Sequence, residues 1–162
     1  MASSVAPRSP ADSFTEMVQV VLPNDANPMG FALGGYVMHQ IDIVGAIAAL
    51  RHTRSLLVTA AVDGLQFLHP IHVGDLIIVT ARVTGAFRTS VEVEVEVFSE
   101  GTLTGDRRLT SVAYLTFVTV EKDGARAVVP PLRLDTDDDR RRAAAADRRR
   151  ATRLRDRRDR QG

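Results

Sequence analysis

Residues 31–52 read FALGGYVMHQIDIVGAIAALRH, and this stretch decides the fold. Its apolar side chains recur at steps of three and four residues in neighbouring rows, one of which comprises Val37, Ile41, Val44 and Ala48. This spacing predicts a helix that is apolar around most of its circumference and is therefore largely buried. The glycine and alanine residues in its second half would let other backbone approach it closely.

The segments around this helix predict β-strands, because they are rich in β-branched residues and are bounded by turn formers. In one of them four valines alternate with three glutamates, which predicts one buried face and one wet face of an antiparallel sheet. The predicted strands cover residues 14–22, 57–68, 75–86, 88–99 and 109–121.

One long buried helix and about five strands predict an α+β fold in which an antiparallel sheet wraps around the helix. A single sheet covers only one side of that helix, so the fold predicts a symmetric dimer or a higher assembly that covers the other side.

The chain divides by composition into three parts. Residues 1–12 predict a flexible N-terminus, residues 13–132 a folded domain, and residues 133–162 an Arg/Asp-rich tail. From residue 135 onward the tail holds eleven Arg and seven Asp but one large apolar side chain, Leu154, so we expect it to be disordered or a solvated helix. Its interleaved Asp residues and lack of aromatic side chains make nucleic-acid binding an unlikely function.

Composition excludes several classes of protein and site. The 162 residues contain no Cys, which excludes disulfides, thiol nucleophiles and cysteine metal sites. The four His residues show no metal-ligand spacing, so we expect no metal site. No apolar run approaches the length of a membrane span, and the N-terminus does not resemble a secretory signal. We therefore expect a soluble cytoplasmic protein without membrane contact.

Asp42 is the most unusual residue of the predicted helix. It lies between Ile41 and Ile43 in the most apolar stretch of the chain, although a buried unpaired Asp is costly. Two interpretations stay open at this point. The carboxylate lies on a wet edge or caps a neighbouring amide, or it lies at a cleft and acts as a base or nucleophile.

Two further groups of residues could carry chemistry. Asn27, Gly34 and Gly35 precede or open the helix, where exposed backbone amides could stabilise a developing oxyanion. The segment 88–90, Arg-Thr-Ser, opens a strand and is suited either to a phosphate or to an ordinary solvated strand start. Each pattern alone has an equally plausible structural interpretation.

Taken together, these stretches resemble the hotdog-fold acyl-CoA thioesterases, the family of bacterial and cytosolic acyl-CoA hydrolases. The similarity spans most of residues 14–132 in the family's order. It rests on PNDANPMGFALGG (23–35), HQIDIVGAIAALRH (39–52), VTAAVDGLQFLHPIHVGD (58–75), RTSVEVEVEVFSE (88–100) and AYLTFV (113–118) before VPPL (129–132).

The resemblance implies a hotdog fold, a homodimer with joined sheets, and a homohexamer built as a trimer of dimers. It implies an enzyme that hydrolyses acyl-CoA to a free acid and CoA, with no cofactor beyond the CoA of the substrate. It places Asn27 from one subunit beside Asp42 from its partner.

For this reaction we expect Gly34 and Gly35 to present helix amides to the thioester carbonyl oxygen. The resemblance also implies that Arg88, Thr89 and Ser90 contact CoA. Asp42 would deprotonate a water molecule or attack directly as a carboxylate. The family commonly has Gly just before its Arg-Thr-Ser, whereas this chain has Phe87. Two alternatives to hydrolysis stay open: a hotdog acyl-thioester hydratase or dehydratase, and a non-catalytic acyl-CoA-binding protein.

Overall fold

A computed structural model describes residues 5–161 of the chain. The helix and all five strands predicted from the sequence are present, with ends that differ by three residues at most. The elements are α1 (Pro10–Ser13), β1 (Thr15–Val20), η1 (Pro23–Asp25), α2 (Gly34–Thr53), β2 (Leu57–Phe67), β3 (Leu76–Ala86), β4 (Ser90–Glu100), β5 (Arg107–Thr119) and α3 (Asp137–Gln161).

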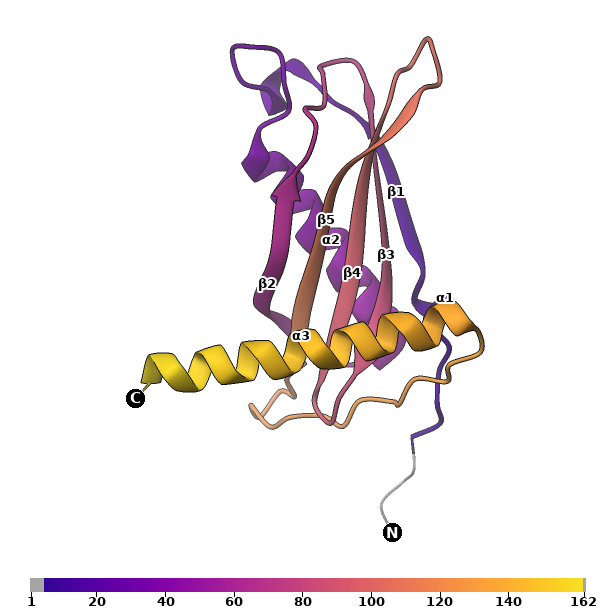
Figure 1. Cartoon of the computed structure of the whole chain (residues 1–162), viewed down its shortest axis with the longest axis vertical. Helices are drawn as coiled ribbons and strands as arrows, with labels where there is room; N and C mark the ends of the chain where they lie inside the picture. The colour runs from indigo at the N-terminus through magenta and orange to yellow at the C-terminus, as the bar shows by residue number, and fades with distance from the viewer. Residues whose placement is uncertain (1–4, 162) are drawn as a thin grey trace.

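The strands form one antiparallel sheet in the order β1-β3-β4-β5-β2. Helix α2 lies on one face of this sheet and contacts all five strands, while α3 crosses the opposite face (Figure 1). The expected arrangement of an antiparallel sheet around one central helix is therefore confirmed.

The core lies between α2 and the sheet. The four alternating valines of β4 are fully buried on this inner face, together with Ile41, Val44 and Phe117. Gly45 permits the close approach expected of the helix, because a Cβ there would lie 3.3 Å from Val95 Cγ2 and 3.4 Å from the Phe117 ring. Packing at this density leaves little space for larger side chains.

On the outer face of the sheet, two expectations are wrong: a tail that is disordered or solvated, and a solvent-exposed glutamate face of β4. The tail is helical over Asp137–Gln161, and this helix is docked on the sheet rather than solvated all round (Figure 1). The glutamate face of β4 is consequently not wet, because Glu92 is fully buried and Glu94 is 8% exposed. The physical reason is charge pairing between arginines of α3 and these carboxylates. The scarcity of apolar residues in the tail gives no indication of such contacts.

The ion pairs that hold α3 follow each other along the helix. Arg142 pairs with Glu94, Arg149 binds Glu92 through both Nε (3.0 Å) and Nη2 (2.7 Å), and Arg153 binds Asp63 at 2.8 Å. The Arg149 guanidinium also lies 3.6 Å from the centroid of the Tyr114 ring, so the contact combines a charge pair with stacking.

The N-terminal prediction needs a smaller correction. Residues 1–4 of the predicted flexible segment lie outside the described residues, but the segment is anchored from Arg8 onward. The Arg8 backbone N–H donates to Pro131 O, its guanidinium donates to the carbonyl of His52, and Ser9 caps α1. Hydrogen bonds to α2 and to the 130–133 segment thus order residues that composition marks as flexible.

The far side of α2 is not covered by the sheet. Met38, Ile43 and Ile47 on this side are 47%, 37% and 37% exposed, and the neighbouring edge strand β2 exposes Val58 and Val62. This agrees with the expectation that one sheet leaves part of the helix bare. Within residues 5–161, no helix combines the length and hydrophobicity needed to span a bilayer.

Candidate active site

Asn27 organises the loop that leads into α2. Its side-chain Oδ1 accepts hydrogen bonds from the backbone N–H groups of Met29 (3.0 Å) and Phe31 (3.1 Å). Gly30 in the same loop has φ +80°, a conformation that favours glycine. The Asn27 Nδ2 group makes no hydrogen bond to the described part of the chain, so it is available as a donor.

A cavity of about 360 Å³ lies beside this loop and the start of α2. Asn27, Gly34, Val37 and Phe67 are among its lining residues. The helix begins at Gly34, and first-turn amides of a helix have no intrahelical partners. Because Leu33 provides no side-chain cap, these amides also lack a capping side chain. The structure therefore brings Asn27 and the amide end of α2, where Gly34 and Gly35 lie, to one cavity.

Asp42 lies elsewhere on the same helix. It is exposed on the bare side of α2, and the Thr59 hydroxyl donates to its Oδ1 at 2.7 Å. It does not line the cavity of Asn27, and it follows Gly34 by eight residues, which corresponds to about 12 Å along a helix axis. One chain thus presents the two predicted catalytic residues at separate places.

Thr59 is the hydrogen-bond partner of Asp42, and the sequence analysis did not single it out. It occupies a strand of valine and alanine residues, and a bulge between Thr59 and Ala61 interrupts the pairing of β2 with β5. The available signal was one hydroxyl residue in an apolar edge strand that follows the Asp-bearing helix. A lone hydroxyl residue does not show that Asp42 is its partner, because that contact depends on how β2 packs beside α2.

The Arg88–Ser90 turn lies at the other end of the sheet from Asn27. It joins the end of β3 to the start of β4. The Arg88 carbonyl accepts a hydrogen bond from Val129 N–H. The next residue, Pro130, accepts a hydrogen bond from His52 near the end of α2, so the turn lies at that end of the helix. The Asn27 loop instead adjoins the start of α2. The three predicted groups are therefore not assembled within a single chain.

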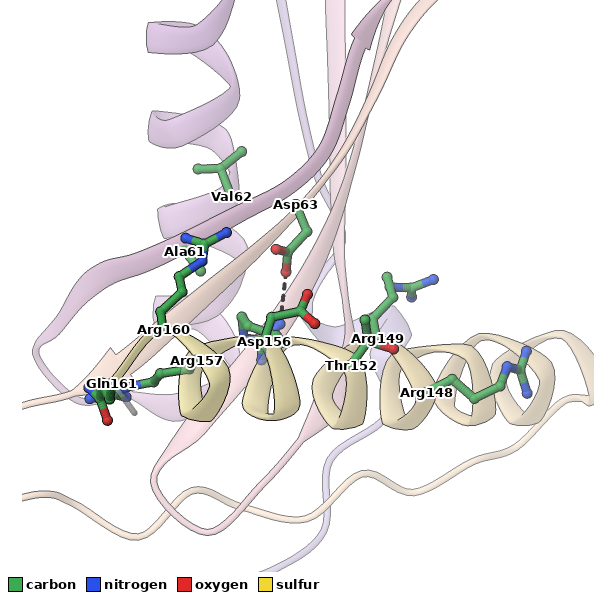
Figure 2. Close-up of a pocket in the computed structure, with 11 residues that line it drawn as sticks. Ala61, Val62, Asp63, Arg148, Arg149, Thr152, Asp156, Arg157, Arg160 and Gln161 are labelled. Carbon is green, nitrogen blue, oxygen red and sulfur yellow. Dashed lines mark hydrogen bonds and ion pairs between the residues drawn. The ribbon is translucent and has the colours of Figure 1, made fainter.

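A second cavity, of about 720 Å³, is lined mainly by charged side chains. It lies between α3 and the edge strand β2, and Figure 2 shows that several arginines and Asp63 line it. None of the residues predicted for catalysis or for CoA contact lines it. Helices α3 and α2 lie on opposite faces of the sheet (Figure 1).

The histidines do not form a ligand set. Among the described residues, no group of three or more His, Asp or Glu side chains is placed to hold a metal ion. His52 is fully buried, and its Nε2 lies 2.7 Å from Pro130 O, to which it donates. Burial lowers the pKa of His52, which indicates a neutral structural histidine.

Comparison with known proteins places these features in a family. The model of the thioesterase superfamily matches residues 29–105. An uncharacterized acyl-CoA thioester hydrolase of Bacillus subtilis is 36% identical over 118 residues, covering 73% of this chain and 69% of the relative. The human cytosolic acyl coenzyme A thioester hydrolase is 31% identical over 134 residues, which is 82% of this chain but 35% of that protein.

Solved structures agree with the fold over nearly the whole chain. An apo-hexameric acyl-CoA thioesterase has a TM-score of 0.89 at 35% identity and covers 93% of this chain and 97% of its own. An acyl-CoA hydrolase of Staphylococcus aureus in complex with butyryl coenzyme A and coenzyme A has a TM-score of 0.83 at 30% identity, covering 93% and 94% of the two chains. Further structures of the Staphylococcus aureus enzyme carry single replacements of an Asp, an Asn or a Thr by Ala.

Proposed function

This chain belongs to the thioesterase superfamily, and we propose that it hydrolyses acyl-CoA thioesters at a site to which two copies of the chain contribute. The observation that carries the shared site is the position of Asp42. Its carboxylate is held by Thr59 on a bare apolar helix face, away from the cavity of Asn27. A second copy packed on this face would cover the exposed apolar side chains and bring its own Asn27 loop to Asp42.

The replaced residues of the Staphylococcus aureus hydrolase support this choice of residues. The Asn, Asp and Thr of those variants are separated by 15 and 17 positions, and Asn27, Asp42 and Thr59 have the same spacing. The matching residue types at matching separations favour Asn27, Asp42 and Thr59 as one functional set.

The assembly follows from the same face. Dimers form through the bare side of α2 and the edge strand β2, both of which expose apolar side chains. A solved hexameric acyl-CoA thioesterase has a similar fold at 35% identity, so we expect three such dimers to form a hexamer. The cytosolic human relative supports a cytoplasmic location.

The chemistry requires a water molecule and a stabilised oxyanion. Water attacks the thioester carbonyl carbon, the C–S bond breaks, and CoA leaves as a thiolate that receives the proton taken from water. Asp42 accepts that proton, while the first-turn amides at Gly34 and Gly35 donate to the carbonyl oxygen. Asn27 Nδ2 orients the water or the carbonyl, and it comes together with these amides from the subunit opposite the one that supplies Asp42.

Direct attack by the Asp42 carboxylate would use the same arrangement. It would form a mixed anhydride between Asp42 and the acyl group, which water then hydrolyses. Hydroxylamine that attacks the Asp42 carbonyl carbon of this anhydride would release the acyl group as a carboxylate and leave a hydroxamate on the enzyme, a product that its direct reaction with acyl-CoA cannot give. Absence of the hydroxamate assigns Asp42 as the base. The site needs no metal or organic cofactor in either case, because a thiolate is a good leaving group.

The decisive assay measures thiol release from short, medium and long acyl-CoAs by the purified full-length protein. Asp42→Asn should lower kcat by about 10²–10⁴-fold with the fold intact, since general-base catalysis contributes about that much. Near-normal turnover by this variant would remove Asp42 from the mechanism. A hydratase would add water to an enoyl-CoA without thiol release, and a binding protein would release no thiol from any substrate.

A further inference from the structure

Phe87, which stands where the family commonly has Gly, lies between the Arg88–Ser90 turn and α3. A Cβ added to Gly85 would lie 3.1 Å from Phe87 Cζ and 3.0 Å from the Cβ of Ala146 in α3. On the other side, the Arg150 guanidinium lies 4.6 Å from the centroid of the Phe87 ring. The ring therefore fills the space that Gly85 leaves open, and α3 covers it.

The residues on both sides of the turn contact neighbouring positions of α3. Phe87 precedes the turn and contacts Arg150, while Glu92 follows it and binds Arg149 through two hydrogen bonds. The Thr84 hydroxyl donates to the same buried carboxylate at 2.8 Å. The start of β4 is thus held from outside by one turn of α3.

The backbone of the turn is held from the other side by the body of the domain. Thr119 N–H donates to Thr89 O at 3.0 Å and Val129 N–H donates to Arg88 O at 3.0 Å, while Phe87 N–H closes the turn by donating to Ser90 O at 2.8 Å. These bonds leave the Arg88 side chain exposed at the surface.

We infer that α3 is a positioning element for coenzyme A, which acts through Phe87 and Arg150 on the Arg88–Ser90 turn. This inference rests on the proposed hydrolysis of acyl-CoA and on the contact of that turn with CoA that the family resemblance implies, which we take to involve the nucleotide part of CoA. Neither Phe87 nor Arg150 touches the reacting thioester. Loosening them should weaken the binding of the nucleotide and leave the chemical step unchanged.

The test compares two substrates with the same acyl group, one on CoA and one on N-acetylcysteamine, which lacks the nucleotide. Phe87→Gly and Arg150→Ala should each raise KM for acyl-CoA by about threefold or more, the scale of one lost cation–π contact, with kcat unchanged. Neither variant should change kcat/KM for the N-acetylcysteamine thioester. Phe87→Tyr keeps the ring and should restore KM, and Arg148→Ala, an exposed neighbour on α3, is the control.

Arg88→Ala separates failure of this inference from failure of the proposed CoA contact. If Arg88→Ala raises KM for acyl-CoA while Phe87→Gly and Arg150→Ala do not, the turn binds CoA without help from α3 and the inference is overturned. If Arg88→Ala also has no effect, the CoA contact and the inference fall together, while thiol release by the wild-type protein still stands. Equal losses on both substrates would indicate general damage to the fold and would also overturn it.

Discussion

Replacing Arg149 by Ala tests whether α3 is docked in solution as it is in the structure. Glu92 is fully buried, and its carboxylate accepts two hydrogen bonds from Arg149 and one from Thr84. Without Arg149, the carboxylate would keep only the Thr84 hydroxyl in a site closed to water. Removing one partner of a buried ion pair costs about 3–5 kcal/mol.

The loss of stability in Arg149→Ala has an upper limit, because α3 can detach from the sheet and let water solvate the Glu92 carboxylate. We therefore expect a decrease of about 3 kcal/mol in the free energy of unfolding, which is about 6–12 °C in Tm for a chain of this size. Urea denaturation at one fixed protein concentration measures it, since assembly also stabilises the folded chain. The exposed neighbour Arg148 provides the matched control, and Arg148→Ala should change stability by less than about 0.5 kcal/mol.

A double variant tests whether the unpaired charge of Glu92 causes the loss of stability. Arg149→Met combined with Glu92→Gln removes both charges and should recover most of the stability lost in Arg149→Ala. A loss below about 1 kcal/mol in Arg149→Ala would mean that Glu92 is already solvated. The outer face of β4 would then be wet, as the Val/Glu alternation suggests, and the docked position of α3 would be refuted.

Four further results are expected. Gly45→Val should destabilise the fold by about 1–3 kcal/mol by urea denaturation, because the new methyl groups would meet Val95 and Phe117; no loss would contradict the close packing. Because burial lowers the pKa of His52, the folded state holds it neutral and the unfolded state protonates near pH 6.5, so stability should fall by up to about 1.4 kcal/mol per pH unit below that value. His52→Gln, which keeps a donor for Pro130 but does not titrate, should flatten this dependence, and an unchanged slope would assign it to other groups. Thr59→Val should lower kcat about tenfold by removing the hydrogen bond to Asp42, whereas Thr59→Ser should retain activity; equal losses would exclude the hydroxyl. Asn27→Asp keeps the acceptor for the loop amides and removes the donor, so it should lose thiol release at a Tm near that of wild type, and a fully active variant would exclude the donor role.

The fold was predictable because the strongest sequence patterns report on the inner face of the sheet. The apolar rows of the 31–52 segment and the alternating valines of β4 follow helical and strand periods, and both patterns mark the core. Hydrophobic periodicity does not report on charged contacts. The docking of α3 depends on arginine and glutamate side chains that are far apart in sequence, so composition alone suggested a disordered tail.

The site was predictable only in part, for a related reason. Asp42 is recognisable because a carboxylate is unusual in an apolar helix, and Asn27 because it precedes Gly30 and the two glycines of the helix start. Thr59 has no such local contrast, and its role depends on the packing of β2 beside α2. The link between Phe87 and α3 likewise depends on a contact between segments about sixty residues apart.

Mixing two inactive variants measures the shared site most directly. Homodimers of Asn27→Asp and of Asp42→Asn should each release little thiol, because every site lacks one residue. After complete subunit exchange in an equal mixture, half of the dimers are mixed and one of their two sites is intact, so the account predicts about one quarter of wild-type activity. If exchange is proven by mass spectrometry and activity stays at the level of the separate variants, both residues act within one chain and the shared site is contradicted.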